Sequence, residues 1–461
     1  MVASPATTRS LVDLTETRNL DRIIASESER FRRQMPRSAE MTEIAKQNLA
    51  GGVTSSWQIS EPHPIWIDSG RGSRVIDVDG NEYVDFHGGY GAMLAGHAHP
   101  AIVKAINERL AKGTHFAQPV EDAMIVAQEL AARYGLPLWR FGNSGTEATM
   151  DAVHLMRAFT GRDVIVKFEG GYHGHHDSVQ VSTWVEEGLG SYHRPRSVAG
   201  SPGIPEAIVQ LTKVAPFNDL AAVEEIFAEG SVAGVIVEPV LMNCGIVPPE
   251  PGFLEGLREL TRAHGALLTF DEVKTGLTIG RGGATVRFGV TPDLICLAKS
   301  LGGGLPVAAI GGSEEVMGLI SDEIYEQVGT FNGNPLGMAA ARAMLTEVLV
   351  PATYTDLTHT TEKMGEQVRR LVKDYELMAY VTDLGAKGAI TYSPRRITNY
   401  RQFLKVDGRY SLAAWLTQFN RGVFLPPWTK GEQWLLSVQH SDADIDLYLE
   451  TLEEFARMLR S

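Results

Sequence analysis

The sequence predicts an α/β protein: a mainly parallel sheet with helices on both faces, plus a smaller α+β domain. Two observations support this fold class. From residue 100 onward, segments with helical spacing alternate with short apolar runs, which is typical of crossover units around a parallel sheet. Each apolar run is followed directly by polar residues or glycine, as expected where strands end at a binding site.

Length and composition limit the classes of function. A chain of 461 residues is too long for one small core and indicates two or more domains. The formal net charge of -14 argues against non-specific nucleic-acid binding. The two cysteines, Cys244 and Cys296, lie in apolar surroundings and provide no disulfide framework, which fits a reducing compartment.

The chain shows no targeting or membrane signal. No apolar run reaches the roughly 20 residues that span a bilayer. Residues 1–19 lack the apolar centre of a secretory signal and are predicted to form a mobile tail. We therefore expect a cytoplasmic protein with no membrane partner.

The N-terminal segment, residues 1–95, is predicted to contain a helix and a hairpin. Apolar residues recur at helical spacing over 20–35. Alternating apolar and polar residues at 74–78 and 82–86 flank Asp79-Gly80, a strong hairpin signal. We expect this segment to form part of the smaller domain.

The middle segment, residues 96–340, is the predicted large domain. It begins with helices over 100–111 and 120–134. Short apolar runs then predict buried strands over 138–141, 163–168, 232–237, 266–270 and 294–298. Because ligands bind beyond the carboxyl ends of such strands, the polar residues that follow these runs should converge on one composite site.

The C-terminal segment, residues 341–461, is the predicted smaller α+β domain. A helix over 336–350 leads away from the sheet, and a second helix is expected over 354–375. A short strand is expected near 388–392.

Lys299 is the first candidate catalytic residue. It follows the apolar run at 294–298 and precedes three glycines, Gly302-Gly303-Gly304. An apolar environment disfavours the ammonium form and leaves a nucleophilic amine. Taken alone, this position favours a surface lysine after a buried strand, and the stretches below shift the balance toward a catalytic role.

The turn Gly142-Asn143-Ser144-Gly145-Thr146 follows one predicted strand and opens a helix. Backbone N–H groups at a helix start, together with two hydroxyls, can hold a phosphate group. An ordinary Ser/Thr N-cap is the more common use of these residues. The turn matches neither the Walker loop nor the dinucleotide fingerprint, so ATP and NAD are not favoured.

Three further features follow strands. Asp271 would be a poorly hydrated carboxylate, and its cationic partner would be a protonated pyridine nitrogen, an arginine or a lysine. Tyr172 would stack on a planar ring or cap the edge of the core. The histidines at 173, 175 and 176 invite a metal interpretation, but no partner cluster is evident, and we expect no metal site.

Together, several stretches resemble a class III aminotransferase, within the glutamate-1-semialdehyde aminomutase-like branch. The ordered set is highly specific and comprises Ser144-Gly145-Thr146-Glu147-Ala148, Gly171-Tyr172-His173-Gly174, Glu238-Pro239-Val240, Phe270-Asp271-Glu272-Val273, Leu297-Ala298-Lys299-Ser300 and Gly329-Thr330-Phe331-Asn332-Gly333-Asn334-Pro335. The resemblance implies a fold-type I enzyme with a seven-stranded-type sheet and pyridoxal 5'-phosphate (PLP) as cofactor.

The resemblance also implies roles for individual residues. Lys299 would form the Schiff base with PLP and move the substrate proton, and Asp271 would keep the pyridine nitrogen protonated. Tyr172 would stack on the ring. Thr330 would reach the phosphate of a neighbouring subunit, which implies a homodimer with shared active sites. The remaining implied cofactor contacts are Ser144, Gly145 and Thr146 at the phosphate, and His173, Asn243 and Val273 around the ring.

The substrate side departs from the family. Where the branch carries an arginine that grips a carboxylate, this chain has Gln58, which cannot supply a charged fork. Ser55 lies in the same loop. Trp57 and Tyr90 would line the pocket, and Glu432 aligns with an acidic residue near the aminomutase site. Several aromatic residues around one pocket favour a bulky or aromatic amine.

We therefore expect a PLP-dependent transaminase. It would move an amino group between a primary amine or amino acid, with a hydrophobic or aromatic group, and a keto acid or other carbonyl acceptor. An aminomutase or a racemase/epimerase on the same cofactor is the alternative. A non-catalytic protein of this fold would be expected to lack Lys299 or Asp271, and both are present.

Overall fold

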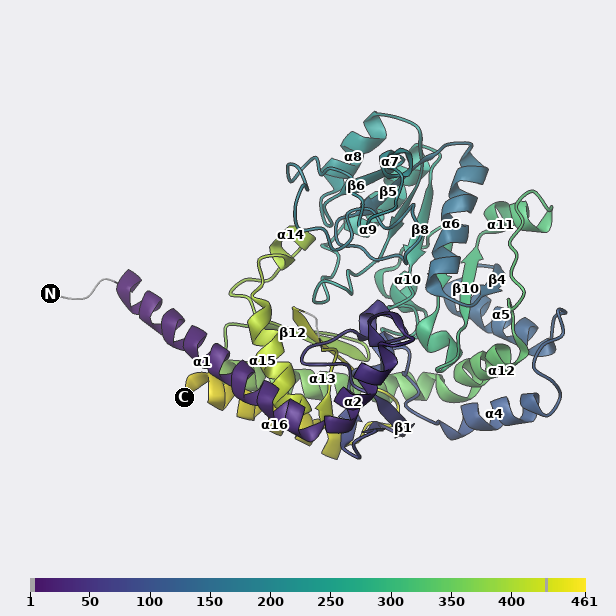
Figure 1. Ribbon diagram of the computed structural model, residues 1–461. Helices are drawn as coiled ribbons and strands as arrows, with labels where there is room; N and C mark the ends of the chain where they lie inside the picture. Colours follow the sequence, from purple (N-terminus) through teal and green to yellow (C-terminus); the bar gives the residue numbers. More distant parts are fainter. Residues whose placement is uncertain (1–4, 428–429) are drawn as a thin grey trace.

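The computed structural model describes residues 5–427 and 430–461 (Figure 1). Its largest sheet has seven strands in the order β4-β10-β9-β8-β7-β5-β6. β10 runs antiparallel to both β9 and β4, and the other neighbours are parallel. The mainly parallel sheet is therefore confirmed. Its strands are β4 (Leu138–Gly142), β5 (Val164–Phe168), β6 (Thr212–Ala215), β7 (Val232–Val237), β8 (Leu267–Asp271), β9 (Leu294–Leu297) and β10 (Ala308–Gly312).

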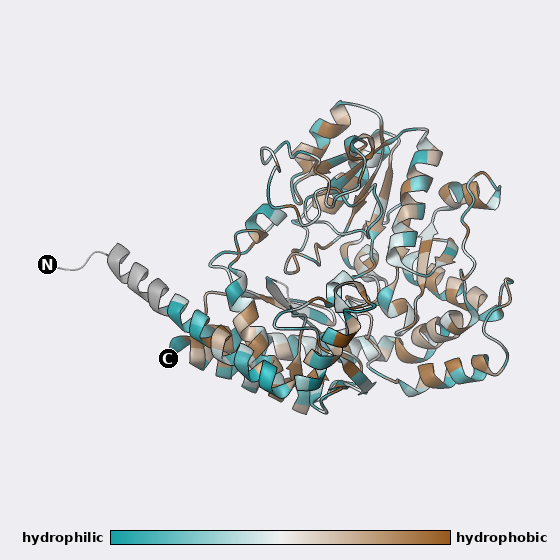
Figure 2. Ribbon diagram, in the orientation of Figure 1, coloured by the Kyte–Doolittle hydropathy of each residue, from teal (hydrophilic) through white to brown (hydrophobic). Residues whose placement is uncertain are grey.

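Helices cover both faces of this sheet, as predicted. α6 and α11 pack on one face, while α8 and α9 cover the opposite face near β5 to β8 (Figure 1). The strands are mostly apolar and lie inside these helical layers (Figure 2). The helices of this part are α4 (Pro100–Leu110), α5 (Glu121–Tyr134), α6 (Gly145–Thr160), α7 (Glu206–Gln210), α8 (Leu220–Ala228), α9 (Phe253–Ala263), α10 (Gly283–Phe288), α11 (Glu314–Ser321) and α12 (Pro335–Ala343).

Strand β9 shows why a continuous apolar run marks a strand buried on both faces. Leu294 and Cys296 point into the core beneath α6, while Ile295 and Leu297 join the core around α5 and α12. Both sets are fully buried, so no polar residue interrupts the run. The chain leaves this strand at Lys299, the first residue of the 3-10 turn η3 (Lys299–Gly302).

Strands β6 and β10 were not predicted. β10 is composed of Ala-Ala-Ile-Gly-Gly and carries little β-propensity of its own. Its glycines are required by packing, because a Cβ on Gly311 would lie 2.6 Å from the Trp139 ring. Pairing with β4 and β9, and not the local sequence, therefore makes this segment a strand.

The two ends of the chain pack together. β3 pairs in parallel with β13, and α1 packs against α15 and α16. The β2–β3 hairpin is confirmed. The first sheet has the order β1-β2-β3-β13, with β1 (Ile67–Arg71), β2 (Arg74–Asp77), β3 (Glu82–Asp85) and β13 (Val423–Phe424). The second has the order β11-β12-β14, with β11 (Tyr380–Leu384), β12 (Lys387–Thr391) and β14 (Gly431–Leu435).

The helices of this part are α1 (Pro5–Gln34), α2 (Pro36–Ala45), α3 (Gly88–Gly91), α13 (Pro351–Asp374), α14 (Tyr400–Phe403), α15 (Gly408–Phe419) and α16 (Asp442–Arg460), and a π-helical turn, η4 (Met344–Val348), follows α12. The domain division at residues 95 and 340 stays a prediction. No helix in the described ranges is long and apolar enough to cross a membrane.

The prediction of a mobile N-terminal tail was wrong from Pro5 onward, because α1 begins there. Leu20 and Ile23 are buried against the C-terminal helices, and Asn19 Nδ2 donates to the Leu459 carbonyl at 2.9 Å. Contacts with a segment more than 400 residues away hold this helix, and no local pattern reveals them. Residues 1–4 lie outside the described residues.

Candidate active site

A cavity of about 420 Å³ lies at the carboxyl ends of the large sheet's strands. It is formed by the turns that follow β4, β5, β7, β8 and β9, in agreement with the expected convergence. The structure brings together at this cavity most of the predicted cofactor residues, namely Ser144, Gly145, Thr146, Tyr172, His173, Asn243, Asp271, Val273 and Lys299.

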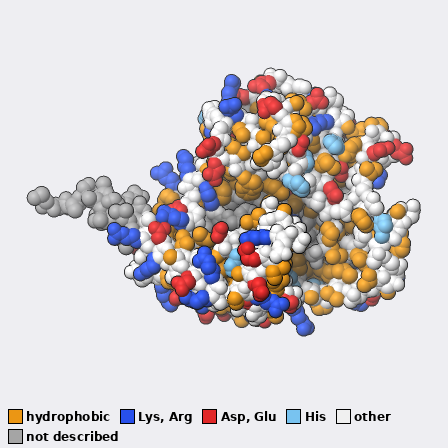
Figure 3. Space-filling view, viewed as in Figure 1, with side chains coloured by type: hydrophobic (Ala, Val, Ile, Leu, Met, Phe, Trp, Pro, Cys, Tyr) orange, Lys and Arg blue, Asp and Glu red, His pale blue; other side chains and the backbone are white. Residues whose placement is uncertain are grey.

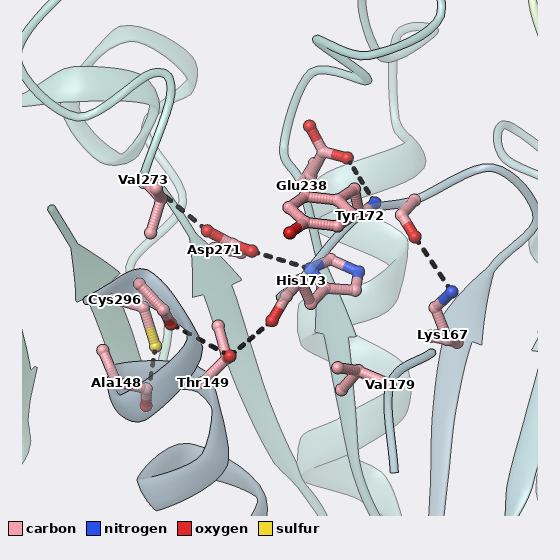
Figure 4. Close-up of polar contacts among 12 residues, drawn as sticks. Ala148, Thr149, Lys167, Tyr172, His173, Val179, Glu238, Asp271, Val273 and Cys296 are labelled. Carbon is pink, nitrogen blue, oxygen red and sulfur yellow. Dashed lines mark hydrogen bonds and ion pairs between the residues drawn. The ribbon is translucent and has the colours of Figure 1, made fainter. Parts of the chain in front are cut away.

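Asp271 is the last residue of β8 and its side chain is almost fully buried. Its Oδ2 lies 2.8 Å from His173 Nδ1, and its Oδ1 accepts a hydrogen bond from the Val273 amide at 3.1 Å (Figure 4). His173 Nε2 is buried without a hydrogen-bond partner among the described residues. The His173 ring thus orients a buried carboxylate that borders the cavity, where a cationic N–H group would be stabilised.

The start of α6 is suited to binding an anion. Ser144 is the N-cap, and its hydroxyl accepts from the Glu147 amide at 3.3 Å, so the ordinary capping role predicted as the alternative is present. The amides of Gly145 and Thr146 have no acceptor among the described residues and lie at the positive end of the helix dipole. The hydroxyl of Thr146 lies 3.3 Å from His175 Nδ1.

Gly145 is needed for the close packing of this turn. A Cβ on Gly145 would lie 3.0 Å from Val273 Cγ2 and 3.1 Å from Cγ1. The missing side chain lets the first turn of α6 approach Val273, two residues after the end of β8. The anion site and the Asp271 carboxylate therefore border one cavity.

Lys299 has a left-handed backbone with φ of 52°, which is unusual for a residue with a side chain. Burial lowers the pKa of Lys299, and the negative charges of Asp271 and Glu238 partly oppose this shift. The strained turn directs the amine away from the strand and into the cavity. A buried amine with a lowered pKa is suited to nucleophilic attack and proton transfer.

A chain of polar groups runs along one wall of the cavity. Glu238 accepts a hydrogen bond from the Tyr172 amide at 2.8 Å and from Asn243 Nδ2 at 3.2 Å. Asn243 Oδ1 in turn accepts from Lys274 Nζ at 2.6 Å. Burial, followed by the charge of Lys299, lowers the pKa of Lys274 to about 7. Burial raises the pKa of Glu238.

Glu238 and Lys274 were not among the predicted site residues. Glu238 had a signal in the sequence, because it directly follows β7 in the same way that Asp271 ends β8. Lys274 had no such signal, because the sequence does not show that its side chain is buried near Lys299.

A row of aromatic side chains lies beside the cavity, and only Tyr172 of this row lines it, while Trp57, Tyr90 and Trp184 line a smaller adjoining cavity. The ring centroids of Trp57 and Tyr90 lie 5.1 Å apart, edge to face, and those of Trp57 and Tyr172 are also 5.1 Å apart. Tyr90 Oη donates to the Trp57 carbonyl at 2.9 Å. Trp184, which the sequence did not single out, extends the row at 6.4 Å from Tyr172.

The loop residues Ser55 and Gln58 do not line the cavity. Gln58 Oε1 accepts from the Thr54 amide at 3.0 Å, the Thr54 hydroxyl at 2.8 Å and the Ser55 amide at 3.2 Å. Ser55 caps the short turn η2 (Ser56–Gln58) in a reciprocal capping box. Both side chains are exposed and serve the conformation of their own loop.

Two predicted residues lie elsewhere. Thr330 is exposed and lines a separate cavity of about 440 Å³ together with Phe116. Asn332 connects the two regions, because its Oδ1 accepts from Asn143 Nδ2 at 3.2 Å. Glu432 belongs to β14 and pairs with Ile390, and its side chain lies outside the described residues.

Comparisons with known proteins agree with this geometry. The family model for aminotransferase class III matches residues 57–425. A glutamate-1-semialdehyde 2,1-aminomutase from Aquifex aeolicus is 39% identical over 423 residues, covering 90% of this chain and 98% of the relative.

Similar solved structures include a transaminase and an aminomutase. An omega-transaminase from Sphaerobacter thermophilus has a TM-score of 0.88 with 33% identity, covering 92% of this chain and 98% of that one. A variant of a glutamate-1-semialdehyde aminomutase from Pseudomonas aeruginosa PAO1, in complex with PMP, has a TM-score of 0.88 with 31% identity, covering 96% of this chain and 99% of that one.

Proposed function

This chain belongs to the class III aminotransferase family, and we propose that it is a transaminase for primary amines or amino acids with a hydrophobic or aromatic group. The enzyme class and the PLP cofactor follow from the family. The observation that carries the proposal is that Lys299, Asp271 and the start of α6 border one cavity.

The residues of the cavity fit PLP. The unpaired amides at the start of α6 suit its phosphate group, and the buried Asp271 carboxylate suits a protonated pyridine nitrogen. Lys299 would hold the cofactor as a Schiff base. When bound, PLP supplies an electron sink that stabilises negative charge on the substrate carbon.

The chain's own residues then have distinct tasks. Asp271 would hold the proton at the ring nitrogen, and His173 would position Asp271. Lys299, with its lowered pKa, would accept the proton from the substrate carbon and deliver it to the C4′ atom of the cofactor. Tyr172 would cover the ring face, and the aromatic row from Trp57 to Trp184 would exclude water from the reacting atoms.

The alternative is an aminomutase or racemase/epimerase on the same cofactor. It is supported by relatives that bear the aminomutase name. Gln58 counts against it, because its side chain caps its own loop and supplies no charge for a substrate carboxylate. A requirement for a second carbonyl substrate separates the two functions: product formed from one substrate alone would select the aminomutase or racemase.

We further propose a homodimer in which Thr330 reaches the neighbouring subunit's cavity. Val328 and Phe331, on either side of Thr330, are 79% and 57% exposed. Apolar side chains gather on this side of the molecule over α4 and α12 (Figure 3). Such a face is suited to burial against a second copy of the chain.

A spectroscopic experiment tests the proposed transaminase. The purified protein loaded with PLP should absorb near the edge of the visible range, lose this band with an amine donor and regain it with a keto acid. Lys299→Ala should still fold and bind PLP without turnover. A wild-type protein that stays colourless with added PLP, or an active Lys299→Ala variant, would refute the proposal.

A further inference from the structure

A second, smaller cavity adjoins the cofactor cavity. The two share Asn243 and Lys274 in their walls. The smaller one is also lined by Trp57, Tyr90 and Lys387, and its volume is about 20 Å³. This volume is close to that needed for one water molecule, so the cavity is suited to a small polar group.

Lys387 is the unexplained residue of this cavity. It is the first residue of β12 and only 3% exposed. Its side-chain nitrogen forms no hydrogen bond or ion pair with any residue in the described ranges. Burying an unpaired charge is costly, so a lysine is retained there only at a loss of stability.

The ammonium of Lys387 lies beside the reacting lysine. A Cβ built on Gly91 would lie 3.3 Å from Lys387 Nζ and 3.9 Å from Lys299 Cδ, so both side chains approach the same point. Lys274 lines the same cavity, and its only hydrogen bond among the described residues is to Asn243 Oδ1. Two lysine side chains therefore meet at a cavity that shares part of its wall with the cofactor cavity.

The described charges around Lys387 are of one sign. Burial, and then the charges of Lys274 and Lys299, hold the pKa of Lys387 well below its usual range, and no carboxylate among the described residues opposes the shift. His87 also lines the cavity, and burial lowers its pKa to about 4, so it adds no charge at neutral pH. An entering anion would restore the ammonium form of Lys387 by supplying the missing partner.

We propose that Lys387 and Lys274 bind the carboxylate of the substrate, and that the amino donor is therefore an amino acid and not a simple amine. This inference rests on the proposed transaminase function and deepens it. A carboxylate is compact and has two oxygens, one for each lysine, which matches the two donors that line this cavity. Lys387 thus supplies the charge that Gln58 cannot supply.

Binding of an unreactive ligand pair to the PLP-loaded enzyme tests this inference. The carboxylate 3-phenylpropionate and its neutral amide, 3-phenylpropanamide, lack the amino group and cannot react. By calorimetry we expect the wild-type enzyme to bind the carboxylate at least about tenfold more tightly than the amide. Lys387→Met should reduce this ratio to about one, while Lys405→Met, which removes an exposed charge, should leave it unchanged.

Thermal unfolding gives a second measurement that does not depend on turnover. Because Lys387→Met removes an unpaired buried charge, the variant without ligand should melt at the same or a higher temperature than the wild type. The carboxylate should raise the Tm of the wild type only. If Lys387→Met does not fold, Lys387→Gln with the same ligand pair takes its place.

Two results would overturn the inference: a wild-type enzyme that does not prefer the carboxylate, or a Lys387→Met variant that keeps the preference. Failure of the proposed function is separate. It would appear as the absence of the spectral cycle with every donor, including 1-phenylethylamine, which has no carboxylate and does not use Lys387.

Discussion

His173 Nδ1 lies 2.8 Å from Asp271 Oδ2 at the carboxyl end of β8, and both side chains are almost fully buried. The contact joins the turn after β5 to the end of β8, two strands separated in the sheet by β7. His173 Nε2 has no partner in the described part of the chain, so Nδ1 makes the ring's polar contact. The histidine therefore fixes the position of the carboxylate.

Asp271→Asn should bind PLP and fold, but its kcat should fall by about 10²- to 10⁴-fold, because an amide cannot keep the ring nitrogen protonated. Transient kinetics of the amine half-reaction measures this loss. Asp151→Asn is the matched control, since Asp151 is also a buried carboxylate but bonds Tyr325 and Gln327 away from the cavity. Turnover in Asp271→Asn equal to that of Asp151→Asn would contradict the assigned role.

Gly145→Ala should weaken PLP binding by about tenfold or more, because the new methyl group would lie 3.0 Å from Val273 Cγ2. Fluorescence titration of the apoenzyme with PLP gives the Kd. Adding Val273→Ala should recover part of the affinity by removing the clash. Gly318→Ala, where nothing lies within 4 Å of the new atom, should leave the Kd unchanged. Equal affinities in Gly145→Ala and wild type would show that this turn does not hold the phosphate.

Lys167 should make the stability of the fold depend on pH. It is fully buried and donates to the carbonyls of Gly171 and Val181 and the hydroxyl of Thr183, at 2.6–2.9 Å. Burial lowers its pKa from 10.5 to about 7, so between these values the unfolded chain binds the proton and the folded chain does not.

The unfolding free energy should consequently rise as the pH increases from about 7 to 10.5, and this contribution is lost as the pH falls back from 10.5 to about 7. One proton corresponds to a slope of up to about 1.4 kcal/mol per pH unit. Urea titrations of wild type and Lys167→Met across this range should show the difference in slope. Parallel curves for the two proteins would mean that Lys167 keeps its ordinary pKa.

Phe331→Glu should convert the proposed dimer to a monomer and lower activity, because a charge would be placed in the interface beside Thr330. Light scattering after gel filtration measures the mass. Ile44→Glu is a close control, since Ile44 and Phe331 are both 57% exposed and Ile44 lies on α2, in a different part of the molecule. A monomeric wild-type protein with full activity would exclude the shared site.

Local patterns in the sequence predicted much of the site. The ends of β8 and β9 place Asp271 and Lys299 at one edge of the sheet, and the start of α6 follows from Ser144 and its capping partner Glu147. These features depend on periodicity and on neighbours within a few residues, which a sequence displays directly.

Other features required the folded chain. Asn19 lies within α1 and donates to the Leu459 carbonyl, a contact between distant parts of the chain that no local pattern reveals. Gln58 lies at a position where the resemblance implied a substrate contact. Three short-range donors instead bind its side chain to its own loop. Strand β10 forms by pairing with β4 and β9, because its own residues have little β-propensity.

The sequence by itself determined the family, and it predicted Lys299 as the reacting lysine and Asp271 as the carboxylate that would support the cofactor, because each is carried by a short contiguous motif. Only the tertiary structure decided that Lys274 and Lys387 share a cavity beside Lys299. The physical reason is that burial and electrostatic environment are sums over neighbours in space. The cost of an unpaired ammonium, and hence the sign of the group it would bind, appears only when those neighbours are known.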